Sequence, residues 1–252
     1  MIRPKKKYGQ HFLKDDNIAG KIARSLSTEH RHIVEVGPGT GILTRHLLQR
    51  KETSLYCFEI DPEAVSFLKI QFPDAGERFI TGDFLEFDLS RLPSPFAVIG
   101  NFPYNISSQI LFRVLEFRDR VPEVVGMFQK EVAERIASPP GNKTYGILSV
   151  LLQAYYNIEI LFRVDPHLFF PPPKVTSAVM RLRRNGTEKL PCDEELFFSL
   201  VKTAFNQRRK TLRNALKEKF GELPAGVKEL ASLRAEQLSV ADFTRLAQAL
   251  RP

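Results

Sequence analysis

Residues 34–41 read Val34-Glu35-Val36-Gly37-Pro38-Gly39-Thr40-Gly41. The apolar residues from 32 to 36 are typical of a buried strand, and the residues from 40 to 50 have the pattern of a helix. Glycines between a strand and a helix let the backbone turn sharply and approach a ligand closely. A single glycine-rich turn is a weak signal, because it can serve NAD, a nucleotide phosphate or S-adenosylmethionine, or only a close strand–helix contact. The stretch therefore predicts an α/β fold and leaves the ligand open.

Strands and helices alternate on both sides of this turn. Strands are predicted at 32–36, 54–59, 78–81, 96–101, 124–129, 157–164 and 175–183. Helices are predicted at 16–27, 40–50, 62–72, 107–117, 130–137 and 145–154. Such alternation favours a mainly parallel sheet with helices on both faces.

The pattern changes near Asn185-Gly186-Thr187. From about Glu194 onward only helical periodicity remains, at 196–205, 210–220, 227–231 and 240–250. We therefore predict two domains: an α/β domain over 1–184 with a basic N-terminal arm, and a small all-α domain over 185–252.

Composition limits the class of protein. The 43% of hydrophobic residues is enough for a core, so the chain does not have the composition of a disordered protein. Lys plus Arg number 37 against 29 for Asp plus Glu, a net charge of +8, which favours nucleic acid over an acidic membrane as a partner, although a generic basic surface has the same charge. Cys57 and Cys192 are far apart, and neither they nor the five histidines have the spacing of metal ligands. We expect no metal, no membrane span and a cytoplasmic location.

Two acidic residues follow successive predicted strands. Glu59 ends the second strand, where a carboxylate can accept hydrogen bonds from both ribose hydroxyls of an adenosine. Asp83 follows the third strand and can accept from an adenine amino group. Either acid alone is more readily explained as a helix cap or a solvated loop carboxylate. As a series after the glycine-rich turn, they favour S-adenosylmethionine as the ligand.

The fourth strand is followed by Asn101-Phe102-Pro103-Tyr104. An amide oxygen can accept an N–H of an adenine amine, proline fixes the turn, and a tyrosine ring can stack on the base. Motifs of this type occur in methyltransferases that act on amino groups. The alternative is an ordinary strand-to-helix turn, in which Asn and Pro are common.

The whole set resembles the ribosomal RNA adenine dimethyltransferase family. The resemblance extends from about Lys5 to Leu216. Its blocks include Tyr8–Leu13, Glu35–Gly41, Glu59–Asp61, Gly82–Asp83, Asn101–Ser107, Gln129–Val132, Tyr145–Val150, Phe169–Val175 and Phe205–Asn214.

The resemblance implies a Rossmann-like methyltransferase sheet that binds S-adenosylmethionine. Cofactor contacts are implied at His11, Leu13, Gly37, Gly39, Glu59, Asp83 and Asn101. His11 stands where the family commonly has asparagine, and Phe102 where leucine is more usual. The implied substrate is a pair of adjacent adenines in the 3′-terminal hairpin of 16S ribosomal RNA within the small subunit. Each adenine would receive two methyl groups on N6, and we expect the enzyme to be a monomer.

The expected catalytic set is Asn101, Phe102, Pro103 and Tyr104. The Asn101 side-chain oxygen and the Phe102 carbonyl would accept the two amine hydrogens. The extruded base would stack between Tyr104 and Phe169, whereas Phe170 is expected in the core.

A basic cluster is expected to contact RNA phosphates. It consists of Arg208, Arg209, Lys210 and Arg213, and Lys5–Lys7 form a second cluster. Lys217 and Lys219 fit a solvated helix face better. Three alternatives stay open: a large-subunit RNA dimethyltransferase of the antibiotic-resistance type, a non-catalytic RNA-binding assembly factor on this fold, and a DNA amino-methyltransferase.

Overall fold

The computed structural model describes residues 2–250, which form two compact units. Among these residues, the sheet unit comprises 2–133 and Ile158–Arg184, and the helical unit comprises Glu134–Asn157 and 185–250. The units meet in sequence at Arg184 and Asn185, as the composition shift suggests. The predicted domains were 1–184 and 185–252. The observed units differ from them because residues 134–157 pack within the helical unit.

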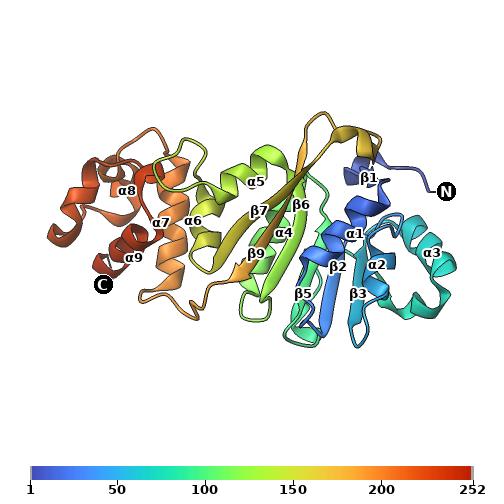
Figure 1. Ribbon diagram of the computed structural model, residues 1–252. Helices are drawn as coiled ribbons and strands as arrows, with labels where there is room; N and C mark the ends of the chain where they lie inside the picture. The colour runs from blue at the N-terminus through green and yellow to red at the C-terminus, as the bar shows by residue number, and fades with distance from the viewer. Residues whose placement is uncertain (1, 251–252) are drawn as a thin grey trace. The chain divides into compact units, whose positions relative to one another are not determined.

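Among the described residues, seven strands form one sheet in the order β4-β3-β2-β5-β6-β9-β7 (Figure 1). Their bounds are β2 His32–Val36, β3 Ser54–Glu59, β4 Phe79–Thr81, β5 Ala97–Asn101, β6 Glu123–Gln129, β7 Tyr156–Val164 and β9 Ser177–Arg184. The strands from β4 to β6 pair in parallel, and β9 pairs antiparallel with β6. The predicted α/β sheet is therefore confirmed. Its parallel part brings the ends of β2, β3, β4 and β5 to one edge.

Helices follow the strands of the sheet unit. Their bounds are α1 Asp16–Ser25, α2 Thr44–Leu48, α3 Pro62–Gln71, α4 Ser107–Glu116 and α5 Lys130–Ala137. Asp15 caps α1 by accepting from the amide of Ile18, and Asp61 caps α3 by accepting from the amide of Glu63. The helix predicted from residue 40 begins only at Thr44. The preceding turn contains glycines with positive φ, a conformation that a right-handed helix does not contain.

A two-stranded ribbon escaped the sequence prediction. It consists of β1 Phe12–Leu13 and β8 Phe169–Phe170, which pair antiparallel with Phe12 opposite Phe170 and Leu13 opposite Phe169. Two-residue strands are too short to have a period. The ribbon joins the N-terminal arm to the proline-rich segment that precedes β9.

The helical unit contains four α-helices among its described residues. They are α6 Ile147–Gln153, α7 Glu194–Asn206, α8 Leu212–Phe220 and α9 Val240–Ala249, and the 3₁₀ segment Ala225–Ser232 lies between α8 and α9 in the chain. Helix α7 packs on the other three. Residues 134–157 belong here because the Tyr155 hydroxyl donates to Glu194 at 2.8 Å and the Gly141 amide donates to the Glu236 carbonyl at 2.7 Å. In the part of the chain that the structure describes, no helix is both long and apolar enough to span a bilayer.

Candidate active site

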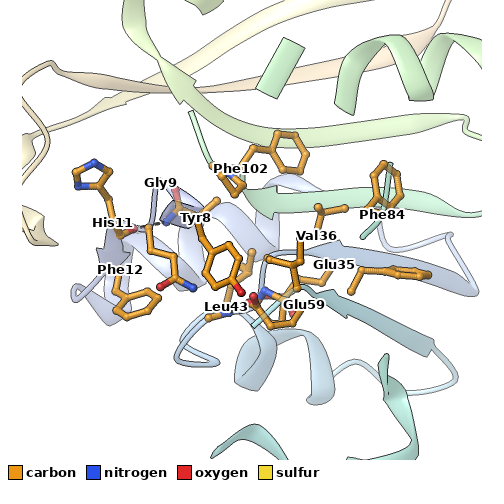
Figure 2. A pocket seen from close by; sticks show the side chains of 18 of the residues that line it. Tyr8, Gly9, His11, Phe12, Glu35, Val36, Leu43, Glu59, Phe84 and Phe102 are labelled. Atoms are coloured by element: carbon orange, nitrogen blue, oxygen red, sulfur yellow. Dashed lines mark hydrogen bonds between the residues drawn. The ribbon is translucent and has the colours of Figure 1, made fainter. Parts of the chain in front are cut away.

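A cavity opens at the carboxyl ends of β2, β3, β4 and β5 (Figure 2). It encloses about 960 Å³ of space, open solvent at its mouth included. All seven residues expected to contact the cofactor line it: His11, Leu13, Gly37, Gly39, Glu59, Asp83 and Asn101. Phe102, Pro103 and Tyr104 line it too. The strand ends thus converge as the series of motifs predicts, although the individual roles stay predictions.

Glu59 holds the glycine-rich turn in shape. Its side chain is 4% exposed, and one carboxylate oxygen accepts from the Gly39 amide and the other from the Asp61 amide, both at 3.0 Å. Gly39 has a φ of +55°, and a Cβ there would come within 3.0 Å of the Phe12 ring. The pKa of Glu59 lies above its ordinary value because burial raises it more than the two amide hydrogen bonds lower it. Each carboxylate oxygen has two acceptor positions, so Glu59 can still accept from ribose hydroxyls.

Asp83 follows β4, where its Oδ1 accepts from the amide of Leu85 at 2.8 Å. This hydrogen bond fixes the carboxylate beside Phe84, whose ring is buried in the cavity wall. The carboxylate therefore closes a turn and does not cap a helix, since the next helical segment after β4 is Leu89–Arg91. This leaves the other carboxylate oxygen for a ligand.

Glu35 is an acid in the cavity wall whose environment the sequence did not reveal. It is 1% exposed, and its Oε2 accepts from the Cys57 thiol at 3.6 Å. Burial raises the pKa of Glu35 to about 7. Glu35 is therefore neutral over part of the physiological pH range, unlike an exposed glutamate.

The Asn101 side chain has a defined orientation. Its Nδ2 donates to the backbone carbonyl of His11 at 2.9 Å. Because the amide nitrogen is engaged in this way, the Oδ1 atom is the group that this cavity-lining residue can offer to a donor. The contact uses the carbonyl of His11, so histidine in place of asparagine at residue 11 does not affect it.

Tyr104 is fixed at its hydroxyl and on one ring face. The hydroxyl hydrogen-bonds the Oγ of Ser177 at 2.5 Å, and Ser177 is fully buried at the start of β9. The His11 imidazole stacks on the ring with 5.6 Å between centroids. Nδ1 of His11 donates to the Pro171 carbonyl at 2.8 Å. His11 thus packs on one face of the Tyr104 ring, and the ring itself lines the cavity.

Phe102 occupies space that two glycines provide. Gly100 and Gly126 are cross-strand partners on β5 and β6. A Cβ on Gly126 would come within 2.3 Å of the Phe102 ring, and one on Gly100 within 2.8 Å. The ring also makes an edge contact with Phe128 at 5.2 Å between centroids. This packing positions the backbone directly after Asn101.

The structure reverses the expected environments of Phe169 and Phe170. Phe169, expected to stack on the base, is 1% exposed in the hydrophobic core, whereas Phe170, expected in the core, is 57% exposed. The reason is the ribbon. Successive side chains of a strand point to opposite faces, and the pairing of Phe169 with buried Leu13 turns Phe169 inward.

The N-terminal arm supplies part of the cavity wall. Sequence reasoning did not assign Tyr8, Gly9, Gln10, Phe12, Ile60 and Ile106, all of which line the cavity. The arm is held by Lys5, whose Nζ lies 2.8 Å from Asp61 and 2.9 Å from Glu63. The sequence predicts that Lys5–Lys7 contact RNA phosphates. Lys5 instead forms ion pairs with two acids of the sheet unit. The family-like block at 8–13 was the signal that this arm belongs to the site.

The basic residues of the helical unit differ in exposure. Arg209, Lys210 and Arg213 are exposed around the start of α8. Arg208 is half-buried, donates to the Lys143 carbonyl and lies 3.8 Å from Glu236. Arg208 therefore has a structural role that the sequence cluster did not indicate.

The cavity fits an adenosine-containing methyl donor. Gly39 permits a close backbone approach, Glu59 offers a buried carboxylate, and Asp83 with Phe84 offers an acceptor beside an apolar ring. The next strand, β5, ends at Asn101, whose side-chain amide is oriented by its hydrogen bond to the His11 carbonyl. Fold and site together define an S-adenosylmethionine-dependent methyltransferase.

Comparison with known proteins narrows the class. The sequence profile of the ribosomal RNA adenine dimethylase family matches residues 1–251. The chain is 52% identical to ribosomal RNA small subunit methyltransferase A of Cytophaga hutchinsonii, with 99% of this chain and 98% of that protein covered. The chain belongs to the ribosomal RNA adenine dimethylase family.

Solved structures agree with this membership. A dimethyladenosine transferase from Plasmodium falciparum has a TM-score of 0.78 and 25% identity, covering 94% of this chain and 96% of that one. The 23S rRNA methyltransferase ErmE has a TM-score of 0.68 and 28% identity, covering 94% of this chain and 99% of that one.

Proposed function

We propose that this enzyme dimethylates N6 of two adjacent adenines in the 3′-terminal hairpin of 16S ribosomal RNA within the small subunit, and that it acts as a monomer. The observation that carries the proposal is the Asn101 amide, whose nitrogen donates to the His11 carbonyl and whose oxygen is left for an amine hydrogen. The small-subunit name of the relative at 52% identity supports the choice of RNA.

In the proposed mechanism, Glu59, Asp83 and the turn through Gly37 and Gly39 hold the cofactor. S-adenosylmethionine supplies an electrophilic methyl group on a sulfonium when bound. Glu59 accepts from the ribose hydroxyls, and Asp83 accepts from the adenine amino group. The apolar wall around Phe84 excludes water from this part of the cavity.

Asn101 and Phe102 act on the target amine. The N6 lone pair is delocalised into the purine ring, so the amine is a poor nucleophile. In the first transfer, Oδ1 of Asn101 and the carbonyl of Phe102 would each accept one N6 hydrogen, which draws the nitrogen towards a tetrahedral shape and frees its lone pair. In the second transfer the nitrogen carries one hydrogen, which one of the two acceptors would hold. No strong base is required, because the nitrogen becomes acidic only after methylation and then loses its proton to water. Alignment of this kind can contribute on the order of 7–11 kcal/mol to catalysis.

Tyr104 receives the extruded base on the ring face opposite His11. Stacking of a base on an aromatic ring contributes roughly 1–3 kcal/mol, similar to the cost of taking the base out of its stack. The Tyr104 hydroxyl bond to Ser177 keeps the ring plane fixed, so little further ordering is needed when the base enters. Arg209, Lys210 and Arg213 supply cations for RNA phosphates.

Large-subunit ribosomal RNA is the second candidate substrate. The specific observation in its favour is the likeness to ErmE, a 23S rRNA methyltransferase, at 28% identity. The 52% identity to a small-subunit enzyme weighs against it. A non-catalytic assembly factor is disfavoured because Glu59, Asp83, Asn101 and Tyr104 all line one cavity.

A methyl-transfer assay tests the proposal. Unmethylated small and large ribosomal subunits are incubated separately with the enzyme and radiolabelled S-adenosylmethionine, and the labelled nucleotide is mapped. We expect label on two adjacent adenines of the small-subunit RNA and N6,N6-dimethyladenosine after digestion. Label confined to large-subunit RNA would favour the second candidate, and no label on either would contradict both.

A further inference from the structure

We propose that the exposed ring of Phe170 is a second base-binding site, which stacks on the nucleotide next to the adenine in the cavity. A single exposed apolar side chain is ordinary on a protein surface. Phe170 differs because it is a large aromatic, 57% exposed, on a ribbon whose other strand lines the cavity. The inference rests on the proposed function, since it requires a nucleic-acid substrate.

The ribbon determines which way the ring faces. Leu13 and Phe169 are cross-strand partners, and both are buried. Phe12 and Phe170 are the next pair, so they lie on the opposite face of the ribbon. Directly opposed side chains on one face have Cβ atoms about 4.5–5.5 Å apart. Since Phe12 lines the cavity, Phe170 lies one strand away from a residue of the cavity wall.

The backbone that carries Phe170 is held on both sides. The Lys14 amide donates to the Leu168 carbonyl at 2.8 Å, and Nδ1 of His11 donates to the Pro171 carbonyl at 2.8 Å. The same His11 ring stacks on Tyr104. Tyr104, His11 and the Phe170–Pro171 segment therefore form a connected edge from the base site outward. An aromatic on such a fixed backbone loses little conformational freedom on binding.

The chemistry around Phe170 favours a nucleobase over a protein side chain. Phe170 is continuous with the site that receives the target base, and a nucleic-acid strand must continue outward from that base. Lys174, four residues after Phe170 in the sequence, is exposed and can pair with a phosphate. Aromatic rings combined with basic side chains are the usual platform for single-stranded bases.

The two roles divide between Tyr104 and Phe170. Tyr104 would hold the base that reacts, and Phe170 the base that waits. With two adjacent target adenines, the outer ring would keep the second adenine unstacked and within reach while the first is methylated. Loss of the outer ring should then weaken RNA binding and lower the share of RNA molecules with both adenines modified.

A fluorescence experiment tests the site directly. The RNA is a hairpin with two adjacent adenines in its loop and 2-aminopurine in place of one of them, a base whose emission falls when it stacks on an aromatic ring. The full-length wild-type enzyme is compared with Phe170→Ala and with Phe170→Tyr, which keeps an aromatic ring. Ile70→Ala is the matched control, because Ile70 is an 81% exposed apolar side chain outside the cavity lining.

We expect the wild type and Phe170→Tyr to quench the probe, and Phe170→Ala to quench it much less. The KM for the RNA should rise roughly 5- to 150-fold in Phe170→Ala, the loss expected for one stacked base. The kcat for the first adenine and the thermal stability should change little. Ile70→Ala should match the wild type in all of these measurements.

Equal quenching and equal KM in the wild type and Phe170→Ala would overturn the inference. A Phe170→Ala protein with normal hairpin binding but reduced binding to whole small subunits would also overturn it, since the ring would then dock a ribosomal protein. Wild-type enzyme that quenches the probe in a Phe170-dependent way but transfers no methyl group would support the stacking site and contradict the proposed function alone.

Discussion

The cavity of the sheet unit and the basic turn of the helical unit hold their predicted functional residues in different ways. Groups of the cavity wall are fixed by hydrogen bonds, such as the one from Asn101 to the His11 carbonyl and the one from the Gly39 amide to Glu59. At the basic turn, Arg209 and Lys210 are exposed while their neighbour Arg208 is tied to Lys143 and Glu236. Position in a parallel sheet therefore predicts which side chains lie together better than membership of a charge cluster does.

The largest effect should come from Asn101→Ala. Loss of the amide oxygen should lower kcat by about 10²–10³-fold, the range found when one preorganised group is removed from a transition state. Affinity for RNA should be nearly unchanged, because the proposed phosphate contacts are made by other residues. Single-turnover methyl transfer and filter binding measure the two quantities.

Asn105→Ala is the matched control, since Asn105 is an exposed asparagine in the same motif and outside the cavity lining. It should retain turnover. Two results would contradict this prediction: a wild-type kcat in Asn101→Ala, or a loss of RNA affinity as large as the loss of kcat. Either would mean that the cavity does not act in catalysis separately from RNA binding at the basic surface.

A pH effect should distinguish the buried acid Glu35 from any surface acid. Its pKa is about 7 in the folded protein and about 4.5 when unfolded, so the folded state binds more protons between these values. The contribution of Glu35 to the free energy of unfolding should therefore fall by about 3 kcal/mol as pH rises from 4.5 to 7 and then level off. Urea denaturation at several pH values measures it.

Glu35→Gln should make this part of the pH profile shallower, because the amide cannot ionise. Glu59, whose pKa burial also raises, keeps its own contribution in both proteins. Glu123 does not interfere: burial raises its pKa, but hydrogen bonds with His30, Ser27 and Arg183 lower it more, to about 2, so its contribution to stability is lost only in acid. Parallel profiles for the wild type and Glu35→Gln would contradict the assignment.

Gly126→Ala should destabilise the fold by about 1–3 kcal/mol. The new methyl group would overlap the Phe102 ring, and overpacking a core has a cost of this size. Gly126→Ala combined with Phe102→Leu should recover part of the lost stability, because leucine lacks the ring atoms that the new methyl group would meet. Thermal or urea unfolding of the four proteins of this cycle measures the coupling. Additive effects would mean that the two residues do not share this space.

The smallest expected effect concerns neighbouring arginines. Arg209→Ala should lower the slope of log affinity against log salt by about 1 with little loss of stability, because an exposed cation is removed from phosphate. Arg208→Ala should instead lower the melting temperature, because it removes the contacts with Lys143 and Glu236. If both variants changed the salt slope equally and neither changed the melting temperature, the division between them would be wrong.

Much of the fold could be predicted because its strands carry local patterns. The strand from Ser54 to Glu59 and that from His32 to Val36 agree with the prediction to the residue. The helix predicted from Thr40 begins at Thr44, since apolar periodicity continues through a turn whose glycine φ values prevent a helix. The ribbon of β1 and β8 was missed because two residues cannot show a period.

The sequence by itself determined the succession of motifs after strands, and with it the class of ligand and the atoms that can meet an adenine amine. Tertiary structure alone decided which of Phe169 and Phe170 is exposed and which atom of the Asn101 amide group is hydrogen-bonded within the protein. It also decided which arginine of the basic cluster lies against an acidic side chain. The physical reason is that periodicity records the local alternation of buried and exposed positions. A hydrogen bond between Asn101 and His11, 90 residues apart, depends on chain topology that no local pattern encodes.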